Sequence, residues 1–267
     1  GFGRTGDWNS RILVLVDGHR MNEITYDSVY VGNEAILDID LVDRIEVIRG
    51  PSSSLYGDNA FFAVINITTK KGPDLQSAEL SGEAGSNSTY RARASFGRRF
   101  ENGHEILLSG TSMDSEGRNR IYFPEYGGTA ENLDEEQHRS AFANYRAGGL
   151  TFEGAYVERK KKVPTASYGA GFNDPRYQSV DNRAYLDLAY NTSMGSGIKL
   201  LGKVYYDQYW YHNDFPYDPS IGVEMNKDYV RADWWGAEAQ MIKTLFDRHT
   251  IVAGVDFQNN EKARFLN

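Results

Sequence analysis

The chain has 267 residues, and its 37 acidic and 29 basic side chains give a net charge of −8 at pH 7. This acidity argues against a nucleic-acid partner, because phosphate binding requires a basic surface. Cysteine is absent, which excludes disulfides, thiolate metal sites and cysteine nucleophiles. No apolar run reaches the ~20 residues of a membrane helix. The 18 Tyr and 27 Gly, however, are typical of a membrane β-barrel, whose strands carry one polar face and interfacial aromatic girdles.

Residues 1–73 have a mixed α/β pattern. The continuous apolar run of RILVLVDG, residues 11–18, predicts a buried strand that ends in an Asp-Gly turn. RIEVIRG (44–50) and AVINITTK (63–70) are β-branched and predict two more strands. Between them, Pro51 suits a first helical position and Gly57 suits a helix end with positive φ. We expect a compact strand–helix–strand unit here.

From about residue 77 the apolar residues recur at every second position. In YRARASFG, Tyr90 and Phe96 share one face, whereas Arg91, Arg93 and Ser95 share the other. The same alternation predicts about nine strands, each near the ~10 residues of a tilted membrane strand. The expected ranges are 78–85, 89–98, 104–113, 138–146, 149–159, 182–191, 197–210, 230–243 and 249–262.

The connections between these strands alternate in length. Long polar loops are expected at 114–137, 160–181 and 211–229, and short turns separate the strands between them. Outer-membrane barrels have this parity, with short periplasmic turns and long external loops. The first connection, GSNS, is the exception, because it is short where a long loop is allowed. The fold class is therefore predicted to be a partial antiparallel membrane β-barrel with a small α/β segment before it.

The sequences RILVLVDGHR and IDLVDRIEVIRGPSSSLYGDNAFFAVINITTKKG closely resemble the second half of the plug of TonB-dependent outer-membrane receptors. The resemblance implies a plug part at 1–73 and the first barrel strands at 74–267. It also implies residence in the bacterial outer membrane, contact with lipid, and uptake of a scarce small molecule such as an iron–siderophore complex, haem or cobalamin. No cofactor of the chain's own is implied.

In this family an inner-membrane energy-coupling protein of the TonB type pulls on the plug, and that protein is the partner the resemblance implies. The segment that contacts it is expected to be missing here, because the resemblance starts in the middle of the plug. Nine strands are also fewer than the 22 of plugged outer-membrane transporters. We therefore expect the chain to be an internal piece of a longer receptor, either cut or incompletely traced.

The resemblance also suggests site residues. Arginines of the IEVIRG motif pair with barrel glutamates in the family, so Arg44, Glu46 and Arg49 are candidates for locking the plug to the barrel; an ordinary surface salt bridge is the alternative. The segment at 22–33 is expected to rise toward the extracellular face. Its candidate ligand contacts are Tyr26, Asp27 and Tyr30, and a solvated loop is the alternative.

Two aromatic groups follow the strands. Tyr122, Phe123 and Tyr126 lie in the middle of a loop and are candidate ligand contacts. Tyr209, Trp210 and Tyr211 lie at a strand end, where an interfacial aromatic belt is the favoured interpretation.

Other chemistry has little support in the sequence. The five histidines show no helical pairing, and the acidic run at 134–136 is expected to be a solvated charge run rather than a metal site. No nucleophile elbow, triad or dinucleotide fingerprint is present, so an enzyme is not expected. Two alternatives from other classes stay open: a passive porin-like channel, and a soluble β-rich binding module with its apolar face buried.

Overall fold

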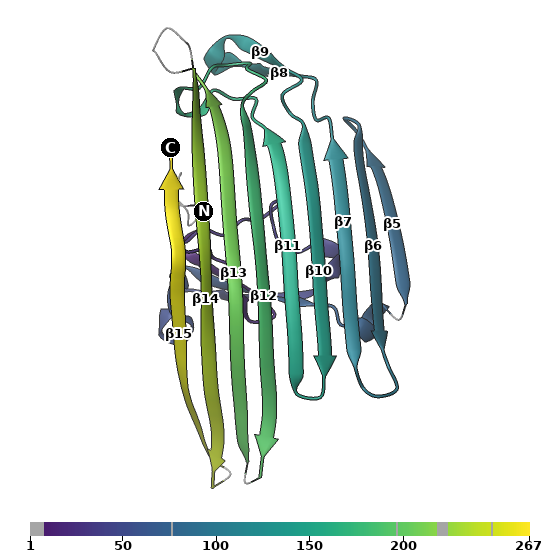
Figure 1. Cartoon of the computed structure of the whole chain (residues 1–267), viewed down its shortest axis with the longest axis vertical. Helices are drawn as coiled ribbons and strands as arrows, with labels where there is room; N and C mark the ends of the chain where they lie inside the picture. Colours follow the sequence, from purple (N-terminus) through teal and green to yellow (C-terminus); the bar gives the residue numbers. More distant parts are fainter. Residues whose placement is uncertain (1–7, 76, 196, 218–223, 247) are drawn as a thin grey trace.

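A computed structural model describes residues 8–75, 77–195, 197–217, 224–246 and 248–267. It contains a nine-stranded antiparallel sheet, a small four-stranded sheet against one face of it, and a separate β-hairpin. Figure 1 shows the large sheet as one continuous layer with the small sheet behind it. None of the helices among these residues is both long and apolar enough to cross a bilayer.

The small sheet forms the core of the N-terminal unit, and its strand order is β2-β1-β4-β3. Its elements are β1 (Ile12–Val16), β2 (His19–Arg20), η1 (Ile39–Leu41), β3 (Val42–Arg49), α1 (Ser53–Tyr56) and β4 (Ala63–Thr69). β1 runs parallel to β4, while β2 and β3 pair antiparallel with their neighbours. The three predicted strands and the helix between the last two are therefore present.

β1 reads as a continuous apolar run because both of its faces are covered. Leu13 packs against Ala60 and Val64 on one side. Val14 and Val16 pack against side chains of the large sheet on the other. The strand then reverses at Asp17 and Gly18, which both have positive φ as a two-residue hairpin turn requires. The tip of this hairpin is thus held close to the large sheet.

The helix boundary differs from the prediction at its start. α1 begins at Ser53 with Ser52 as its N-cap, so Pro51 precedes the helix and does not occupy the first helical position. Its end is as expected, since Gly57 follows with a φ of 75°. A short α2 (Gly72–Leu75) leads to the large sheet, and the boundary expected at 73/74 falls inside it.

The large sheet has the strand order β15-β14-β13-β12-β11-β10-β7-β6-β5, and all nine predicted strands are present in it. They are β5 (Ala78–Gly85), β6 (Thr89–Arg99), β7 (Glu105–Ser115), β10 (Glu136–Ala147), β11 (Leu150–Lys162), β12 (Gln178–Met194), β13 (Ile198–Pro216), β14 (Met225–Leu245) and β15 (His249–Leu266). The last four run several residues beyond their predicted ends.

The long and short connections lie at opposite ends of the sheet, as predicted. The long connection from β7 to β10 carries the hairpin β8 (Arg120–Phe123) and β9 (Gly128–Glu131), with η2 (Pro124–Tyr126) between them. The next one, from β11 to β12, carries η3 (Ser167–Gly169). In Figure 1 the hairpin lies at the top, whereas the turn from β10 to β11 lies at the bottom.

The large sheet buries its polar face against the small sheet and exposes its apolar face, as a membrane barrel requires. On β13, Asp207 and Tyr209 face the small sheet and are each 1% exposed, whereas Val204 on the opposite face is 52% exposed. On β6, Arg93 and Ser95 are buried, whereas Tyr90 is exposed. A soluble sandwich would bury the apolar face and expose the charged one, so this arrangement contradicts the soluble-module alternative.

Candidate functional site

The loop from Met21 to Asp38 lies between the small sheet and the wall formed by β11 to β14. Two buried polar side chains fix its course. The Asn22 amide oxygen accepts from the Val14 backbone N–H at 3.1 Å, and its Nδ2 donates to the Ile12 and Asp27 carbonyls. The Glu23 carboxylate accepts from the backbone N–H groups of Thr25, Tyr26 and Ser28 and from the Ser28 hydroxyl. In this loop, hydrogen bonds between side chains and the backbone take the place of the backbone–backbone hydrogen bonds of regular secondary structure.

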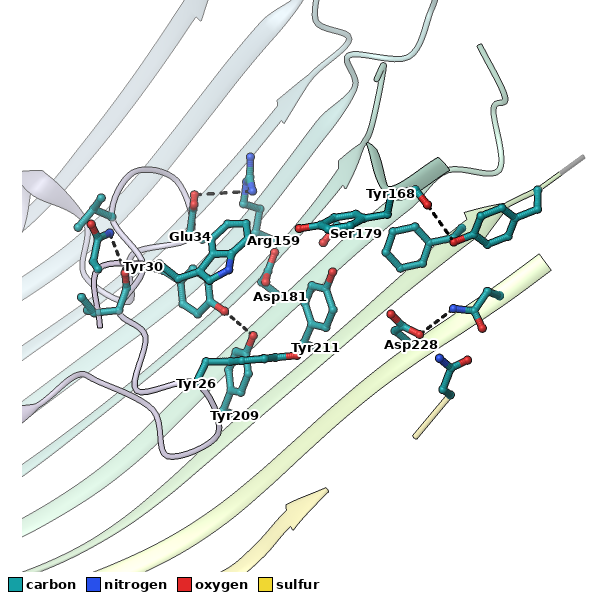
Figure 2. Close-up of a pocket in the computed structure, with 18 residues that line it drawn as sticks. Tyr26, Tyr30, Glu34, Arg159, Tyr168, Ser179, Asp181, Tyr209, Tyr211 and Asp228 are labelled. Atoms are coloured by element: carbon teal, nitrogen blue, oxygen red, sulfur yellow. Dashed lines mark hydrogen bonds and ion pairs between the residues drawn. The ribbon is translucent and has the colours of Figure 1, made fainter. Parts of the chain in front are cut away.

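This loop and the wall together enclose a cavity of about 660 Å³. Figure 2 shows Tyr26 and Tyr30 reaching it from the loop, while Tyr209 and Tyr211 reach it from β13. The lining is strongly aromatic: Trp8, Tyr26, Tyr30, Tyr168, Tyr209, Tyr211, Phe215 and Tyr217. Both structural units therefore contribute rings to one cavity, which suits a ligand with flat or apolar surfaces.

Two of these tyrosines join the loop to the wall directly. The hydroxyls of Tyr30 and Tyr209 are 2.7 Å apart, and the two rings lie nearly parallel with centroids 5.8 Å apart. Burial raises the pKa of Tyr30 to about 12, so its phenol stays neutral at physiological pH. The pair can therefore exchange its mutual hydrogen bond for bonds to a ligand without a change in charge.

The charged groups of the cavity are mostly acidic. Glu34, Asp181 and Asp228 line it, and Arg159 is the basic side chain among the lining residues that the structure describes. The Arg159 guanidinium lies 3.7 Å from Glu34 and 2.7 Å from Glu136. The arginine is thus shared between a loop carboxylate and a barrel carboxylate, which ties the loop to β11.

The predicted ligand contacts divide between several places. Tyr26 and Tyr30 line the aromatic cavity, but Asp27 lines a different, polar cavity on the far side of the loop. Tyr122, Phe123 and Tyr126 lie on the β8–β9 hairpin and do not line the aromatic cavity. Phe123 and Tyr126 pack around Phe172 instead, with centroid separations of 6.0 and 4.9 Å. A ligand role for these residues stays a prediction.

The belt interpretation was wrong for Tyr209 and Tyr211. Both face the N-terminal unit, and Tyr209 is almost fully buried there. The register of β13 carries the signal that would have found them. Residues two apart share a face, so Tyr209 and Tyr211 lie on the same side as the charged Asp207. Side chains on that polar side cannot form a lipid-facing belt.

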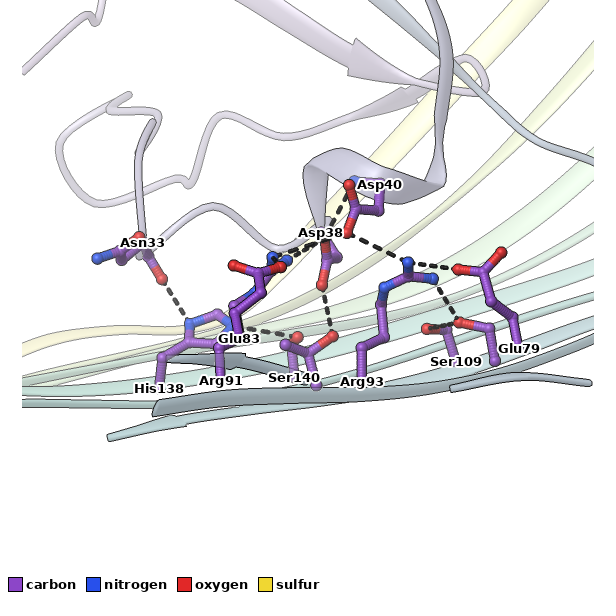
Figure 3. A network of polar contacts seen from close by, with 12 residues as sticks. Asn33, Asp38, Asp40, Glu79, Glu83, Arg91, Arg93, Ser109, His138 and Ser140 are labelled. Carbon is purple, nitrogen blue, oxygen red and sulfur yellow. Dashed lines mark hydrogen bonds and ion pairs between the residues drawn. The ribbon is translucent and has the colours of Figure 1, made fainter. Parts of the chain in front are cut away.

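A polar network joins the end of the loop to β6 and β7 (Figure 3). The Asp38 carboxylate accepts from Arg91 and from the Thr111 hydroxyl, each at 2.5 Å, and from the Asp40 backbone N–H. Arg93 lies 3.2 Å from Asp40. Burial opposes ionisation of Asp38, but these hydrogen bonds outweigh it and lower its pKa.

The residues predicted to lock the plug to the barrel lie elsewhere. Arg44 is more than half exposed on β3 and pairs with Glu46 at 3.1 Å and with Asp43 at 3.6 Å. Glu46 also accepts from Asn66 on β4, and Arg49 is exposed. Among the residues that the structure describes, the recorded ion pairs of Arg44 and Glu46 stay within the small sheet. A locking role for these three residues therefore remains a prediction.

The acidic run at the start of β10 is ion-paired. Asp134 pairs with Lys161, Glu135 with Lys162 and Glu136 with Arg159, so each carboxylate meets a cation of β11. The run is partly exposed, as expected of a charge run, and it is also ion-paired, because the register of β10 and β11 places the two charge runs side by side. Among the described residues, no three or more His, Asp or Glu side chains are grouped so that they could hold a metal ion.

Known proteins resemble this chain in both sequence and structure. The family model described as TonB-dependent Receptor Plug Domain matches residues 1–64. The chain is 34% identical over 133 residues to the vitamin B12 transporter BtuB of Vibrio vulnificus (strain CMCP6), a match covering 47% of this chain and 20% of that protein.

Solved structures share the fold at low sequence identity. The ferric yersiniabactin uptake receptor FyuA from Yersinia pestis superposes with a TM-score of 0.69 at 18% identity, over 95% of this chain and 40% of that one. The FrpB iron transporter from Neisseria meningitidis (F5-1 variant, apoprotein form) gives 0.67 at 16%, over 94% and 40%.

The chain therefore spans about a fifth of the length of the curated relative and two-fifths of the solved structures. Its small sheet corresponds to the plug of these receptors, and its large sheet corresponds to barrel wall. The chain thus comprises a TonB-dependent receptor plug domain at residues 1–64, followed by strands that share the fold of the barrels of these bacterial outer-membrane receptors.

Proposed function

We propose that this chain is the ligand-responsive part of a receptor for the active uptake of a scarce solute, and that the solute binds in the aromatic cavity between plug and barrel. The observation that carries the proposal is the shared lining of that cavity. Tyr26 and Tyr30 come from a plug loop, whereas Tyr209 and Tyr211 come from the wall. A ligand that contacts both parts favours one position of the loop over others, which is how binding biases a conformation.

The energy for transport would come from a TonB-type coupling protein that acts mechanically on the plug. The candidate solutes are an iron–siderophore complex, haem and cobalamin. The relatives include a vitamin B12 transporter, a ferric yersiniabactin uptake receptor and an iron transporter, which supports this range of solutes. The aromatic lining fits all three classes, because each offers flat rings or apolar surface for stacking.

The test is energy-dependent uptake by the intact receptor in cells, using cyanocobalamin, haemin and a set of ferric siderophores as probes. Tyr30→Ala and Tyr209→Ala should each lower uptake of one probe at least tenfold. The matched control is Tyr190→Ala, because Tyr190 lies exposed on the opposite face of the sheet. Two results would contradict the proposal and favour a passive channel. One is uptake that persists after the proton-motive force is collapsed, and the other is uptake that neither cavity substitution changes.

A further inference from the structure

His19 is a buried plug side chain clamped between two carboxylates of the barrel wall. Its Nδ1 lies 3.0 Å from Asp187 Oδ2 on β12, and its Nε2 lies 3.0 Å from Asp207 Oδ1 on β13. The Tyr185 ring stacks on the imidazole with centroids 4.1 Å apart, and Tyr205 meets its edge. Only 3% of the His19 side chain is exposed. The β1–β2 hairpin therefore places this titratable group in a closed polar socket.

The geometry fixes the protonation state of this group. An ionised carboxylate can only accept hydrogen bonds, and a neutral imidazole has a single N–H to donate. Both carboxylates have cations of their own, since Arg183 lies 2.5 Å from Asp207 and Lys203 lies 3.3 Å from Asp187. Only an imidazolium, with a proton on both ring nitrogens, gives each of the two carboxylates a histidine donor.

The surroundings support this assignment energetically. Burial opposes the charge on His19, but the attraction of Asp207 and the hydrogen bonds to Asp187 and Asp207 outweigh it, so the pKa is raised above 6.5. The positive charge of Lys203 lowers the pKa of His19. The titratable and charged groups that face the imidazole are Arg183, Tyr185 and Asp187 from β12, and Lys203, Tyr205 and Asp207 from β13.

We propose that His19 is a charged latch that seats the plug hairpin on the barrel wall, engaged as imidazolium and released when the ring loses its proton or a partner. A neutral ring would leave a nitrogen lone pair 3.0 Å from a carboxylate oxygen, and that buried carboxylate would lose its histidine donor. The inference rests on the plug-and-barrel architecture and is independent of which solute is taken up.

The latch borders a polar cavity of about 810 Å³ between the plug and β13 to β15. Glu238, Asp256 and Gln258 line it from the wall, and Arg20 and Asp58 line it from the plug. A displaced hairpin can move into this space, and hydrated ions can follow the polar wall. Release of the latch should therefore raise the ion conductance of the receptor as well as loosen the hairpin.

The pH dependence has a definite sign. Because the folded-state pKa of His19 lies above 6.5, its contribution to plug seating is fully present below pH 6.5 and disappears as the pH rises through the folded-state value. A hairpin held by neutral packing alone would show no such loss. An arginine at this position keeps its charge at all accessible pH values and should remove the dependence.

The first test is nitrogen NMR of the intact receptor labelled with ¹⁵N-histidine in micelles. Both ring nitrogens of His19 should give imidazolium shifts at neutral pH, assigned by their disappearance in His19→Gln. The exposed His249 serves as an internal reference for the spectrum. A neutral His19 with one bare nitrogen at neutral pH would overturn the proposal, and this readout on the wild type does not depend on any variant folding.

The second test is ion conductance of the same receptor in planar bilayers as a function of pH. The wild type should become leakier as the pH rises, and His19→Gln should leak roughly tenfold or more at neutral pH, as expected for loss of charged buried hydrogen bonds. His19→Arg should remain sealed at all pH values. Equal conductance and equal pH profiles in all three proteins would refute the latch, as would a His249→Gln control that leaks like His19→Gln.

Discussion

Replacing Glu23 by alanine should unfasten the plug loop that carries Tyr26 and Tyr30. The Glu23 carboxylate is 1% exposed and accepts from three backbone N–H groups and one hydroxyl. Its own N–H donates to the Ser28 carbonyl at 2.9 Å, so the side chain closes a compact turn. Alanine removes the carboxylate that accepts these four bonds, and only the backbone bond from residue 23 to Ser28 remains in the turn.

The expected loss can be worked out from these bonds. A hydrogen bond to a charged acceptor is worth about 1.5–3 kcal/mol, and four such bonds give roughly 6–12 kcal/mol as an upper bound. Thr25 and Tyr26 are partly exposed, so water replaces some of the lost bonds. We therefore expect about 3–6 kcal/mol of local stability to disappear, which corresponds to roughly a hundredfold or greater loss of exchange protection.

Hydrogen–deuterium exchange of the intact receptor measures this directly. Protection of the amides of Tyr26 and Ser28 should fall in Glu23→Ala and fall less in Glu23→Gln, which keeps one acceptor oxygen. Glu46→Ala is the matched control, because that plug glutamate is about half exposed. If the amides of Tyr26 and Ser28 keep wild-type protection in Glu23→Ala, the carboxylate does not hold the loop and the reasoning fails.

Three further predictions concern the contacts between plug, wall and lipid. Tyr30→Phe and Tyr209→Phe should each cost about 1 kcal/mol of unfolding free energy, and the double variant should cost little more than either single one, because both remove the same 2.7 Å bond; additive losses in denaturant titrations would count against that bond. Because the pKa of Asp38 is lowered from 3.8, its contribution to stability should be complete above pH 3.8 and vanish as the pH falls through the lower folded-state value; thermal unfolding of wild type and Asp38→Asn across that range checks the sign, and identical acid profiles would refute it. Val204→Arg places a charge on the lipid side and should cost up to about 2–4 kcal/mol of folding free energy, the cost of a basic side chain at the bilayer midplane; Leu201→Arg, which borders the polar cavity, should cost less, and refolding of both variants into vesicles measures the difference.

The strands were predictable because their signal is local. An alternation of Tyr90, Ala92 and Phe96 with Arg91 and Arg93 sets both the strand and its two faces, and the structure confirms each face. The alternation of long and short connections indicated a barrel, and this signal requires no knowledge of contacts between distant residues. The plug was predicted from a sequence motif whose own residues form its strands and helix.

The site was only partly predictable because its contacts join residues far apart in the sequence. Tyr30 meets Tyr209, and His19 meets Asp187 and Asp207, across separations of more than 160 residues. No local period encodes which plug residue faces which wall residue. The sequence did place Tyr26 and Tyr30 on the loop, but the family resemblance directed attention to Arg44 and away from His19.

The central claim is that the apolar side of the large sheet faces lipid while its charged side faces the plug. Nitroxide labels at Val204→Cys and Val255→Cys, and at plug-facing Leu201→Cys and Glu238→Cys, test it in the intact receptor in bilayers, because this chain contributes no other cysteine. We expect the first pair to collide mainly with lipid-soluble oxygen and the second pair mainly with a water-soluble nickel complex. The opposite pattern, with Val204 and Val255 shielded from lipid and the plug-facing sites exposed to it, would contradict the account.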